Sequence, residues 1–274
     1  MTMTSARPAA GQPGGSRPRA KIAARTLRTD RWWLQPLVTA VVFGTFVVYT
    51  TVRVFIADHY WVEQYNYLTP VFSPCLSDSC APGSAHLGTW LPKLPFFIPL
   101  PILVFPILAG FRLTCYYYRK SLYRSYWFSP PACGVAEPHK KYTGETRFPL
   151  NLQNSHRYFF FFASVLLLIN TYDAALAFFP GHKFGFGVGS LILLVNVVML
   201  WGYSLSCHAC RHVVGGRLKH FSKHPVRYRM WTLVSKLNAK HMQFAWTSLT
   251  TVMITDLYIM AVAAGWITDF RFVN

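Results

Sequence analysis

The chain has 274 residues, of which 53% are hydrophobic and only 13% are charged, yet its formal net charge is +18. An ordinary globular chain has about 25% charged residues, so this composition excludes a soluble protein. A nucleic-acid-binding protein of this charge would not contain long apolar runs, whereas here Lys and Arg cluster between such runs. The composition therefore predicts a multi-pass membrane protein with basic loops.

The N-terminal segment, residues 1–31, is rich in Pro, Gly, Ala, Ser and Arg, and the first apolar run begins only at Trp32. A cleavable signal peptide would place its short apolar core nearer the start of the chain. We expect residues 1–31 to be a basic, flexible tail and residues 32–274 to be the membrane domain.

Five apolar segments have the roughly 20 residues that a helix needs to cross the hydrocarbon core of a bilayer. They cover residues 33–56, 94–114, 158–179, 186–206 and 242–267. The second is expected to be kinked or partly irregular, because it contains Pro95, Pro99, Pro101 and Pro106. No internal repeat stands out. The predicted fold is an all-α bundle of five transmembrane helices.

The distribution of Lys and Arg predicts the orientation. Seven lie in residues 1–31, eight in 112–157 and eight in 207–240, whereas residues 54–92 contain none. Positively charged loops remain in the cytoplasm. The N-terminus and the loops 112–157 and 207–240 are therefore predicted to be cytoplasmic and the C-terminus to be outside, in the inner (plasma) membrane of a cell.

The cysteines divide between the two sides. Cys75 and Cys80 fall in the long outer loop, where disulfides are permitted, and no histidine pattern surrounds them. We expect them to form a disulfide. On the cytoplasmic side thiols stay reduced and free to bind metal, and this group comprises Cys115, Cys133, Cys207 and Cys210. Cys133 follows two prolines and is interpreted as a turn residue.

A set of possible ligands lies at the inner ends of four predicted spans, namely Cys115, His156, Cys207, Cys210 and His241. Two thiolates and two imidazoles suit a Rieske-type [2Fe-2S] cluster, and equally a structural zinc ion. Two histidines alone, His156 and His241, would ligate haem b. On a helix Cys207 and Cys210 share a face, so we take them as a chelating pair with the two histidines, and Cys115 as the alternative thiol. His208 and His212 share a neighbouring face and are expected on the surface.

Polar and aromatic residues in the spans are the remaining signals. Asp173 and Asp256 are expensive inside a bilayer and suggest a proton path or interhelical hydrogen bonds. Arg53 is expected to snorkel to the outer surface. The aromatic side chains at the inner face favour a flat, apolar slot for a quinone ring, and the candidates are Tyr116, Trp201, Tyr203 and Trp246.

These features together resemble a known family, the membrane anchor of succinate dehydrogenase (succinate:quinone oxidoreductase, complex II). The motifs Asn-Ser-His156-Arg-Tyr, Ser-Cys207-His-Ala-Cys210-Arg-His212 and Asn-Ala-Lys-His241-Met-Gln are similar to the single-subunit anchor of the actinobacterial, mycobacterial-type enzyme. The resemblance covers most of residues 32–274. Family members often carry haem b between paired transmembrane histidines. Histidines deep inside the spans are missing here, which favours an iron–sulfur cluster at the inner face.

The resemblance implies a function in the respiratory chain and the tricarboxylic acid cycle. Soluble flavoprotein and iron–sulfur subunits would dock on the loops 112–157 and 207–240, and electrons from succinate would pass through this subunit to menaquinone or ubiquinone. The sequence contains no acid–base or nucleophilic constellation for dicarboxylate chemistry, so that step is assigned to the partners. The alternatives are a haem-b electron carrier and a non-redox scaffold or transporter with structural zinc. The odd number of spans and the lack of a repeat disfavour a transporter.

Overall fold

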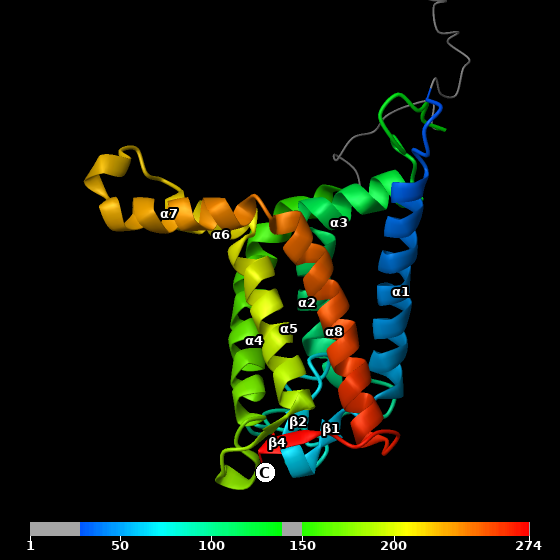
Figure 1. The fold of residues 1–274 in the computed structure, drawn as a ribbon, viewed down its shortest axis with the longest axis vertical. Coiled ribbons are helices and arrows are strands. Elements are labelled where there is room, and N and C mark those ends of the chain that lie inside the picture. The colour runs from blue at the N-terminus through cyan, green and yellow to red at the C-terminus, as the bar shows by residue number, and fades with distance from the viewer. Residues whose placement is uncertain (1–27, 139–149, 274) are drawn as a thin grey trace, which may run out of the picture.

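The computed structural model describes residues 28–138 and 150–273. Most of the predicted basic tail, and residues 139–149 of the loop that follows the second span, therefore lie outside the described residues. The chain forms a bundle of helices that stand side by side (Figure 1). Four helices are long and apolar enough to cross a membrane, counted over the residues that the structure describes: α1 (Leu34–Ile56), α4 (His156–Leu176), α5 (Val188–Leu205) and α8 (His241–Ala263).

The second predicted span is not one continuous helix. It consists of a short 3-10 turn (Leu100–Leu103) and helix α2 (Phe105–Leu113), which has nine residues and is only about 13 Å long. Proline lacks the backbone N–H that a helix interior requires, which accounts for the irregular course before Phe105. Figure 1 shows α2 within the bundle among the four long helices. Of the five predicted spans, four are therefore long helices in the described part of the chain, and the second is irregular, as its prolines indicated.

One end of the bundle, called the inner end below because its loops are predicted to be cytoplasmic, carries the short helices. Helix α3 (Tyr116–Ser121) follows α2 directly and continues into a π-helical turn (Leu122–Tyr126), and a 3-10 segment (Leu150–Ser155) leads into α4. Between α5 and α8, helices α6 (His208–Gly215) and α7 (Pro225–Asn238) project sideways, with a 3-10 turn (Phe221–Lys223) between them (Figure 1).

The opposite end holds two small antiparallel sheets (Figure 1). Strand β1 (Trp61–Val62) pairs with β2 (Tyr67–Leu68) around a 3-10 turn (Glu63–Tyr65). A second 3-10 turn (Pro180–His182) precedes β3 (Phe186–Gly187), which pairs with β4 (Arg271–Val273) and so fixes the C-terminal segment beside the start of α5.

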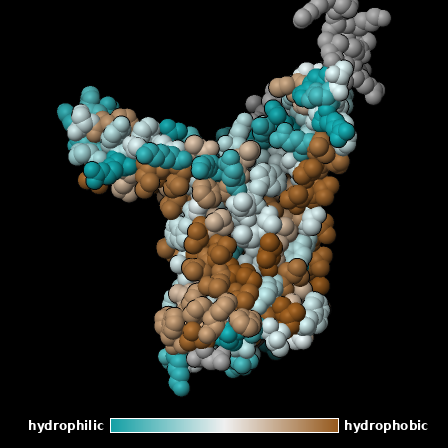
Figure 2. All heavy atoms as spheres, viewed as in Figure 1, coloured by the Kyte–Doolittle hydropathy of each residue, from teal (hydrophilic) through white to brown (hydrophobic). Residues whose placement is uncertain are grey.

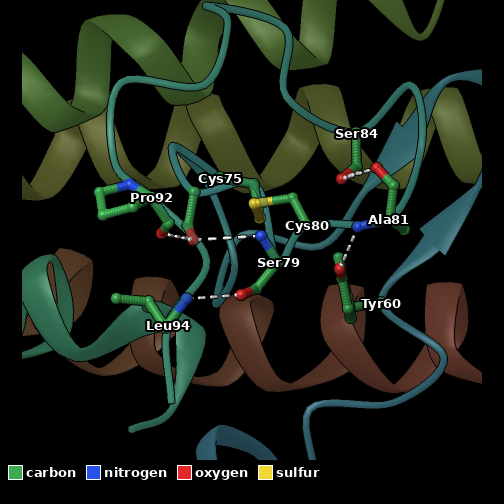
Figure 3. The surroundings of a disulfide bond; sticks show 9 residues. Tyr60, Cys75, Ser79, Cys80, Ala81, Ser84, Pro92 and Leu94 are labelled. Atoms are coloured by element: carbon green, nitrogen blue, oxygen red, sulfur yellow. Dashed lines mark hydrogen bonds between the residues drawn. A yellow bond between two sulfur atoms is a disulfide. The ribbon is translucent and has the colours of Figure 1, made fainter. Parts of the chain in front are cut away.

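The long loop between α1 and α2, called the outer loop because it is predicted to lie outside, contains a disulfide between Cys75 and Cys80, the pair expected from the sequence (Figure 3). Backbone groups are fastened around it: Leu94 N donates to Ser79 Oγ over 2.8 Å, and Ala81 N donates to the hydroxyl of Tyr60 over 2.6 Å. The loop therefore forms a packed cap on this end of the bundle.

The sides of the bundle are apolar (Figure 2). Large hydrophobic side chains on the four long helices are exposed, among them Val48, Phe162, Val198 and Ile254. A water-soluble protein would bury such a belt, so it is the surface that meets lipid. One core cluster of the protein lies at the inner end, around Phe111, Cys115, Tyr118, Tyr203 and Cys207.

Candidate metal centre

Two thiol–imidazole pairs lie in the buried inner core. The Nε2 atom of His156 is 3.0 Å from the sulfur of Cys207, and the Nε2 atom of His241 is 3.5 Å from the sulfur of Cys115. Cys115 and Cys207 are each only 1% exposed, and His241 is 4% exposed. Each pair joins segments that are far apart in the sequence; the Cys115–His241 pair is buried on both sides, whereas His156 is partly buried.

The Nδ1 atom of His156 is held by Thr114, whose Oγ1 lies 2.8 Å away. The same hydroxyl donates its proton to the carbonyl of Gly110 over 2.6 Å. A hydroxyl has a single proton, so towards the imidazole it must accept. His156 therefore carries its proton on Nδ1, and its Nε2 presents a lone pair to the sulfur of Cys207.

The same arrangement holds His241. Ser206 Oγ lies 2.7 Å from Nδ1 of His241 and donates to the carbonyl of Tyr203 over 3.1 Å. His241 is thus also protonated on Nδ1, with the Nε2 lone pair facing Cys115. This is the tautomer in which a histidine binds a metal ion, with its other nitrogen oriented by a hydrogen bond.

Each imidazole is also stacked on an aromatic ring. Phe111 lies against His156 with ring centres 5.0 Å apart and planes 9° apart. Tyr203 lies against His241 at 5.2 Å and 2°. The hydroxyl, the thiol and the stacked ring together fix both the position and the rotation of each imidazole.

The two environments derive from a duplicated sequence element that the sequence interpretation missed. The element occurs as Gly110-Phe-Arg-Leu-Thr-Cys115 and as Gly202-Tyr-Ser-Leu-Ser-Cys207. At five of the six positions the two copies share Gly, an aromatic residue, Leu, a hydroxyl residue and Cys. No internal repeat stands out over the length of the chain, and this short correspondence was not recognised. The signal is present in the sequence, but it is only six residues long.

The histidines lie in a second duplicated element, His156-Arg-Tyr-Phe159 and His241-Met-Gln-Phe244, which opens helices α4 and α8. The phenylalanine of each copy packs on the glycine of the hexapeptide. A Cβ atom at Gly110 would lie 2.3 Å from the Phe159 ring, and one at Gly202 would lie 2.6 Å from the Phe244 ring. Only glycine permits this close approach, which brings α2 onto α4 and α5 onto α8.

The two cysteines occupy the same backbone position. Cys115 precedes α3 with φ −65° and ψ 137°, and Cys207 precedes α6 with φ −64° and ψ 145°. In both cases the chain leaves a membrane segment, extends for one residue and enters a short helix. Each thiol contacts the histidine of the other copy. Cys207 faces the histidine held by Thr114, and Cys115 faces the histidine held by Ser206.

Burial raises the pKa of the Cys207 thiol to about 12 and also raises the pKa of Cys115, because a buried thiolate loses its hydration. Without a cation both residues are neutral thiols at pH 7. Each can then donate its proton towards the Nε2 lone pair that it faces. A bound metal ion would take the place of these two protons.

The other predicted ligands lie around this pair of sites. Cys210 is buried on α6, but it belongs to neither of the two thiol–imidazole pairs; the structure pairs Cys115, the alternative thiol, with His241. His208 and His212 are exposed on α6, and Cys133 is an exposed free cysteine. Among the described residues, no three Cys, His, Asp or Glu side chains are grouped so that they could hold one metal ion.

The four aromatic residues predicted to line a quinone slot are not all together. Tyr203 is buried next to the thiol–imidazole pairs, and the ring of Trp246 lies 5.4 Å from that of Tyr118 in the same region. Tyr116 is half exposed. Trp201 instead donates its indole N–H to Thr171 over 3.0 Å and packs with the cluster around Val197 and Ile259.

A cavity of about 210 Å³ opens beside the pairs, between α1, α2, α4, α5 and α8. Its wall is mostly apolar and includes Phe46, Phe111, Arg112 and Tyr203. The Arg112 guanidinium lies over the ring of Tyr203 at 5.1 Å and donates to the hydroxyl of Tyr118 over 2.7 Å. The sequence analysis counted Arg112 only as a charge of the loop 112–157. In the structure the side chain is buried and lines the cavity.

The polar residues of the outer half have local partners. Asp256 is paired with Arg53 over 2.7 Å and also accepts from the hydroxyl of Tyr49 over 2.6 Å. Arg53 is 3% exposed and also donates to the carbonyl of Asp58, so the prediction that it snorkels was wrong. Asp173 accepts from Ser73 and lies 2.8 Å from Nδ1 of His86 in the outer loop. Both aspartates therefore tie structural elements together.

The comparisons with known proteins agree with this architecture. Residues 34–265 match the family model of the actinobacterial succinate dehydrogenase subunit SdhC. The chain is also similar to a chain in the solved structure "Mycobacterium smegmatis Sdh1 complex in the apo form", with 61% identity and a TM-score of 0.88 over 94% of this chain and 98% of that one. No curated protein matches. The chain therefore belongs to the actinobacterial SdhC family and is a multi-pass membrane subunit of succinate dehydrogenase.

Proposed function

We propose that this subunit is the quinone-reducing anchor of the enzyme and that it holds a Rieske-type [2Fe-2S] cluster through Cys115, Cys207, His156 and His241. The observation that carries this proposal is the duplicated unit in which a Thr or Ser hydroxyl holds a histidine whose Nε2 faces a buried thiol. Cys210 is the alternative to Cys115 as the second thiolate.

The donor set suits this cluster in number and in symmetry. A Rieske centre binds one iron through two cysteines and the other through two histidines. The two cysteines are then equivalent to each other, as are the two histidines. The repeated elements supply one such Cys and one such His each, in matching backbone positions.

The other metal centres fit less well. A structural zinc ion asks for four ligands around one point, whereas the contacts here join the four side chains as two thiol–imidazole pairs. Haem b bound between two histidines requires both Nε2 atoms to face the porphyrin iron. Here each Nε2 faces a cysteine sulfur instead.

When bound, such a cluster transfers single electrons. The residues of this chain perform the remaining tasks. Thr114 and Ser206 keep the histidine Nε2 atoms unprotonated and aimed, and the stacked rings of Phe111 and Tyr203 hold the imidazoles in place. The Tyr203 hydroxyl lies beside the Cys115 thiol and makes no hydrogen bond of ordinary geometry within the described part of the chain, which leaves it available as a donor.

We place the quinone ring in the 210 Å³ cavity. Its apolar walls suit a quinone, and Arg112 offers the charge that a quinone oxygen needs as it is reduced. Tyr203 lies between this cavity and the thiols, so it can contact both.

The orientation that we propose puts the N-terminus and the end with α3, α6 and α7 in the cytoplasm, with five chain segments crossing the membrane. The described parts of the basic loops 112–157 and 207–240 lie at this end, and the disulfide loop, in which residues 54–92 contain no Lys or Arg, lies at the other. The soluble flavoprotein and iron–sulfur subunits would then dock beside the candidate cluster, which shortens the electron path from succinate.

The decisive experiment measures iron, zinc and haem in the purified complex together with its low-temperature electron paramagnetic resonance spectrum. We expect the His156→Ala and His241→Ala variants to contain about two iron atoms fewer per complex than the unmodified protein. The matched control is His212→Ala, an exposed histidine on α6, which should retain the full content. One zinc ion without additional iron, or a b-type haem spectrum lost in both histidine variants, would contradict the proposal.

A further inference from the structure

Helices α6 and α7 form an arm that leaves the bundle sideways (Figure 1). Both roots of the arm are fixed at the ends of membrane helices, because α5 ends at Leu205 and α6 begins at His208, while α7 ends at Asn238 and α8 begins at His241. Asn238 also donates to the carbonyl of Ser206 over 2.7 Å, which ties the two roots together. The arm must therefore lie at the depth where the hydrocarbon ends.

The arm is held together by contacts between its two helices. Arg227 on α7 donates to the carbonyls of Val214 and Gly216 over 3.1 Å each, and Arg211 on α6 lies over the ring of Trp231 at 4.9 Å. A Cβ atom at Gly215 would lie 2.1 Å from the Trp231 ring, so the helices are in close contact. Arg227 and Trp231 therefore mark the side of α7 that faces α6, which leaves the other sides of α7 outward.

A different side of α7 is apolar and uncovered. Val226, Met230, Leu233 and Leu237 follow the spacing i, i+4, i+7, i+11 and so form one stripe along the helix. The first three are 71%, 51% and 61% exposed. Figure 2 shows hydrophobic side chains along the lower edge of the arm where it approaches the apolar sides of the bundle, and hydrophilic ones over much of the rest of the arm. The stripe thus continues the surface that meets lipid.

The charge of the arm is uniformly positive. Residues 207–240 contain eight Lys and Arg and neither Asp nor Glu. On α7, Arg229 and Lys236 lie beside the stripe and are exposed. A basic helix with a narrow apolar stripe is the pattern of helices that lie in a membrane surface and contact anionic lipid headgroups.

We propose that the arm of α6 and α7 rests on the membrane leaflet at its own end of the bundle, with the stripe Val226–Met230–Leu233–Leu237 among the acyl chains and its basic residues at anionic phospholipid headgroups. The upper side of the arm stays free for the soluble subunits. This proposal depends on the chain spanning a membrane and is independent of the cluster and of the quinone site.

The test uses the complete complex in nanodiscs made of equal parts of phosphatidylcholine and phosphatidylglycerol. A photoreactive benzoylphenylalanine replaces Leu233 in one variant and Thr232, on the other side of α7, in the control, and the products are identified by mass spectrometry. We expect lipid adducts at Leu233 and few at Thr232. Equal lipid labelling at the two positions, no lipid adduct at Leu233, or crosslinks from Leu233 to a soluble subunit or to a second copy of this chain would overturn the proposal.

The headgroup preference is tested with the same label at Leu233. Replacing Arg229 and Lys236 by Gln should lower the ratio of phosphatidylglycerol to phosphatidylcholine adducts by up to roughly five-fold for each charge removed. An unchanged ratio would contradict the anionic preference. Unchanged quinone reduction in these variants would confirm that the complex is intact, and a loss of cluster without a change in lipid labelling would affect only the proposed function.

Discussion

The Cys207 thiol lies 3.0 Å from Nε2 of His156, although the two residues belong to different copies of the duplicated element. The reciprocal pair, Cys115 and His241, is formed in the same way. Each copy therefore holds its own histidine with its hydroxyl and supplies its thiol to the other copy. Damage to one copy should consequently affect the whole centre.

The hydroxyl of Thr114 should matter for metal retention. Thr114→Val keeps the size of the side chain but removes the acceptor that holds Nδ1 of His156. Loss of a group that orients a metal-binding histidine lowers the affinity for the metal about 10- to 100-fold. Chelator titration of the purified complex, followed by iron content and electron paramagnetic resonance, should show this loss.

Two variants define the specificity of that effect. Thr114→Ser retains the hydroxyl and should behave like the unmodified protein. Thr247→Val removes an exposed hydroxyl that bonds only within α8 and should have no effect. Equal chelator resistance in all three variants would show that the hydroxyl does not orient a ligand.

The Tyr203 hydroxyl should tune the reduction potential. It is buried beside the Cys115 thiol, and hydrogen bonds to the sulfurs of an iron–sulfur cluster stabilise the reduced form. Tyr203→Phe should therefore lower the potential, on the order of several tens of mV for the loss of one charge-assisted hydrogen bond. A redox titration monitored by electron paramagnetic resonance measures the shift. Tyr116→Phe, at a half-exposed position, should leave the potential unchanged, and a potential that stays the same in Tyr203→Phe would exclude this contact.

The glycines of the two copies should be sensitive to a single added methyl group. Gly202→Ala places a Cβ atom 2.6 Å from the Phe244 ring, which must move. Overpacking of this kind costs about 1–3 kcal/mol, so the unfolding temperature of the detergent-solubilised complex should fall. The double variant Gly202→Ala/Phe244→Leu removes part of the opposing ring and should recover some of this loss. A double variant no better than the single one would place the strain elsewhere.

The ion pair of Arg53 and Asp256 should be needed for stability rather than for electron transfer. Both side chains are buried between α1 and α8, so removing one partner leaves an unpaired buried charge, at a cost of roughly 3–5 kcal/mol. Arg53→Met should therefore destabilise the complex strongly, and Arg53→Met/Asp256→Leu should be more stable than Arg53→Met alone. Thermal unfolding measures both. If Arg53→Met instead unfolds normally but slows quinone reduction, the pair serves proton transfer.

The helical spans, the irregular second segment and the disulfide all follow from local sequence. The four long helices agree with their predicted spans to within a few residues, because about 20 consecutive apolar residues have no other stable place than a membrane or a core. The prolines before Phe105 correctly indicated an irregular second segment. Likewise Cys75 and Cys80 are five residues apart in one loop, and residues so close in sequence need little further information to meet.

The chain alone thus determined the membrane class and most of the segments, since these follow from residue composition and spacing. It did not determine which of the candidate side chains contact each other. The rotation of α2, α3 and α6 against α4 and α8 decides whether Cys115 or Cys210 faces a histidine. Arg53 is buried because α8 brings Asp256 to it. Those contacts join residues more than 100 positions apart, and only the packing of the helices, with Gly110 and Gly202 allowing the close approach, decided them.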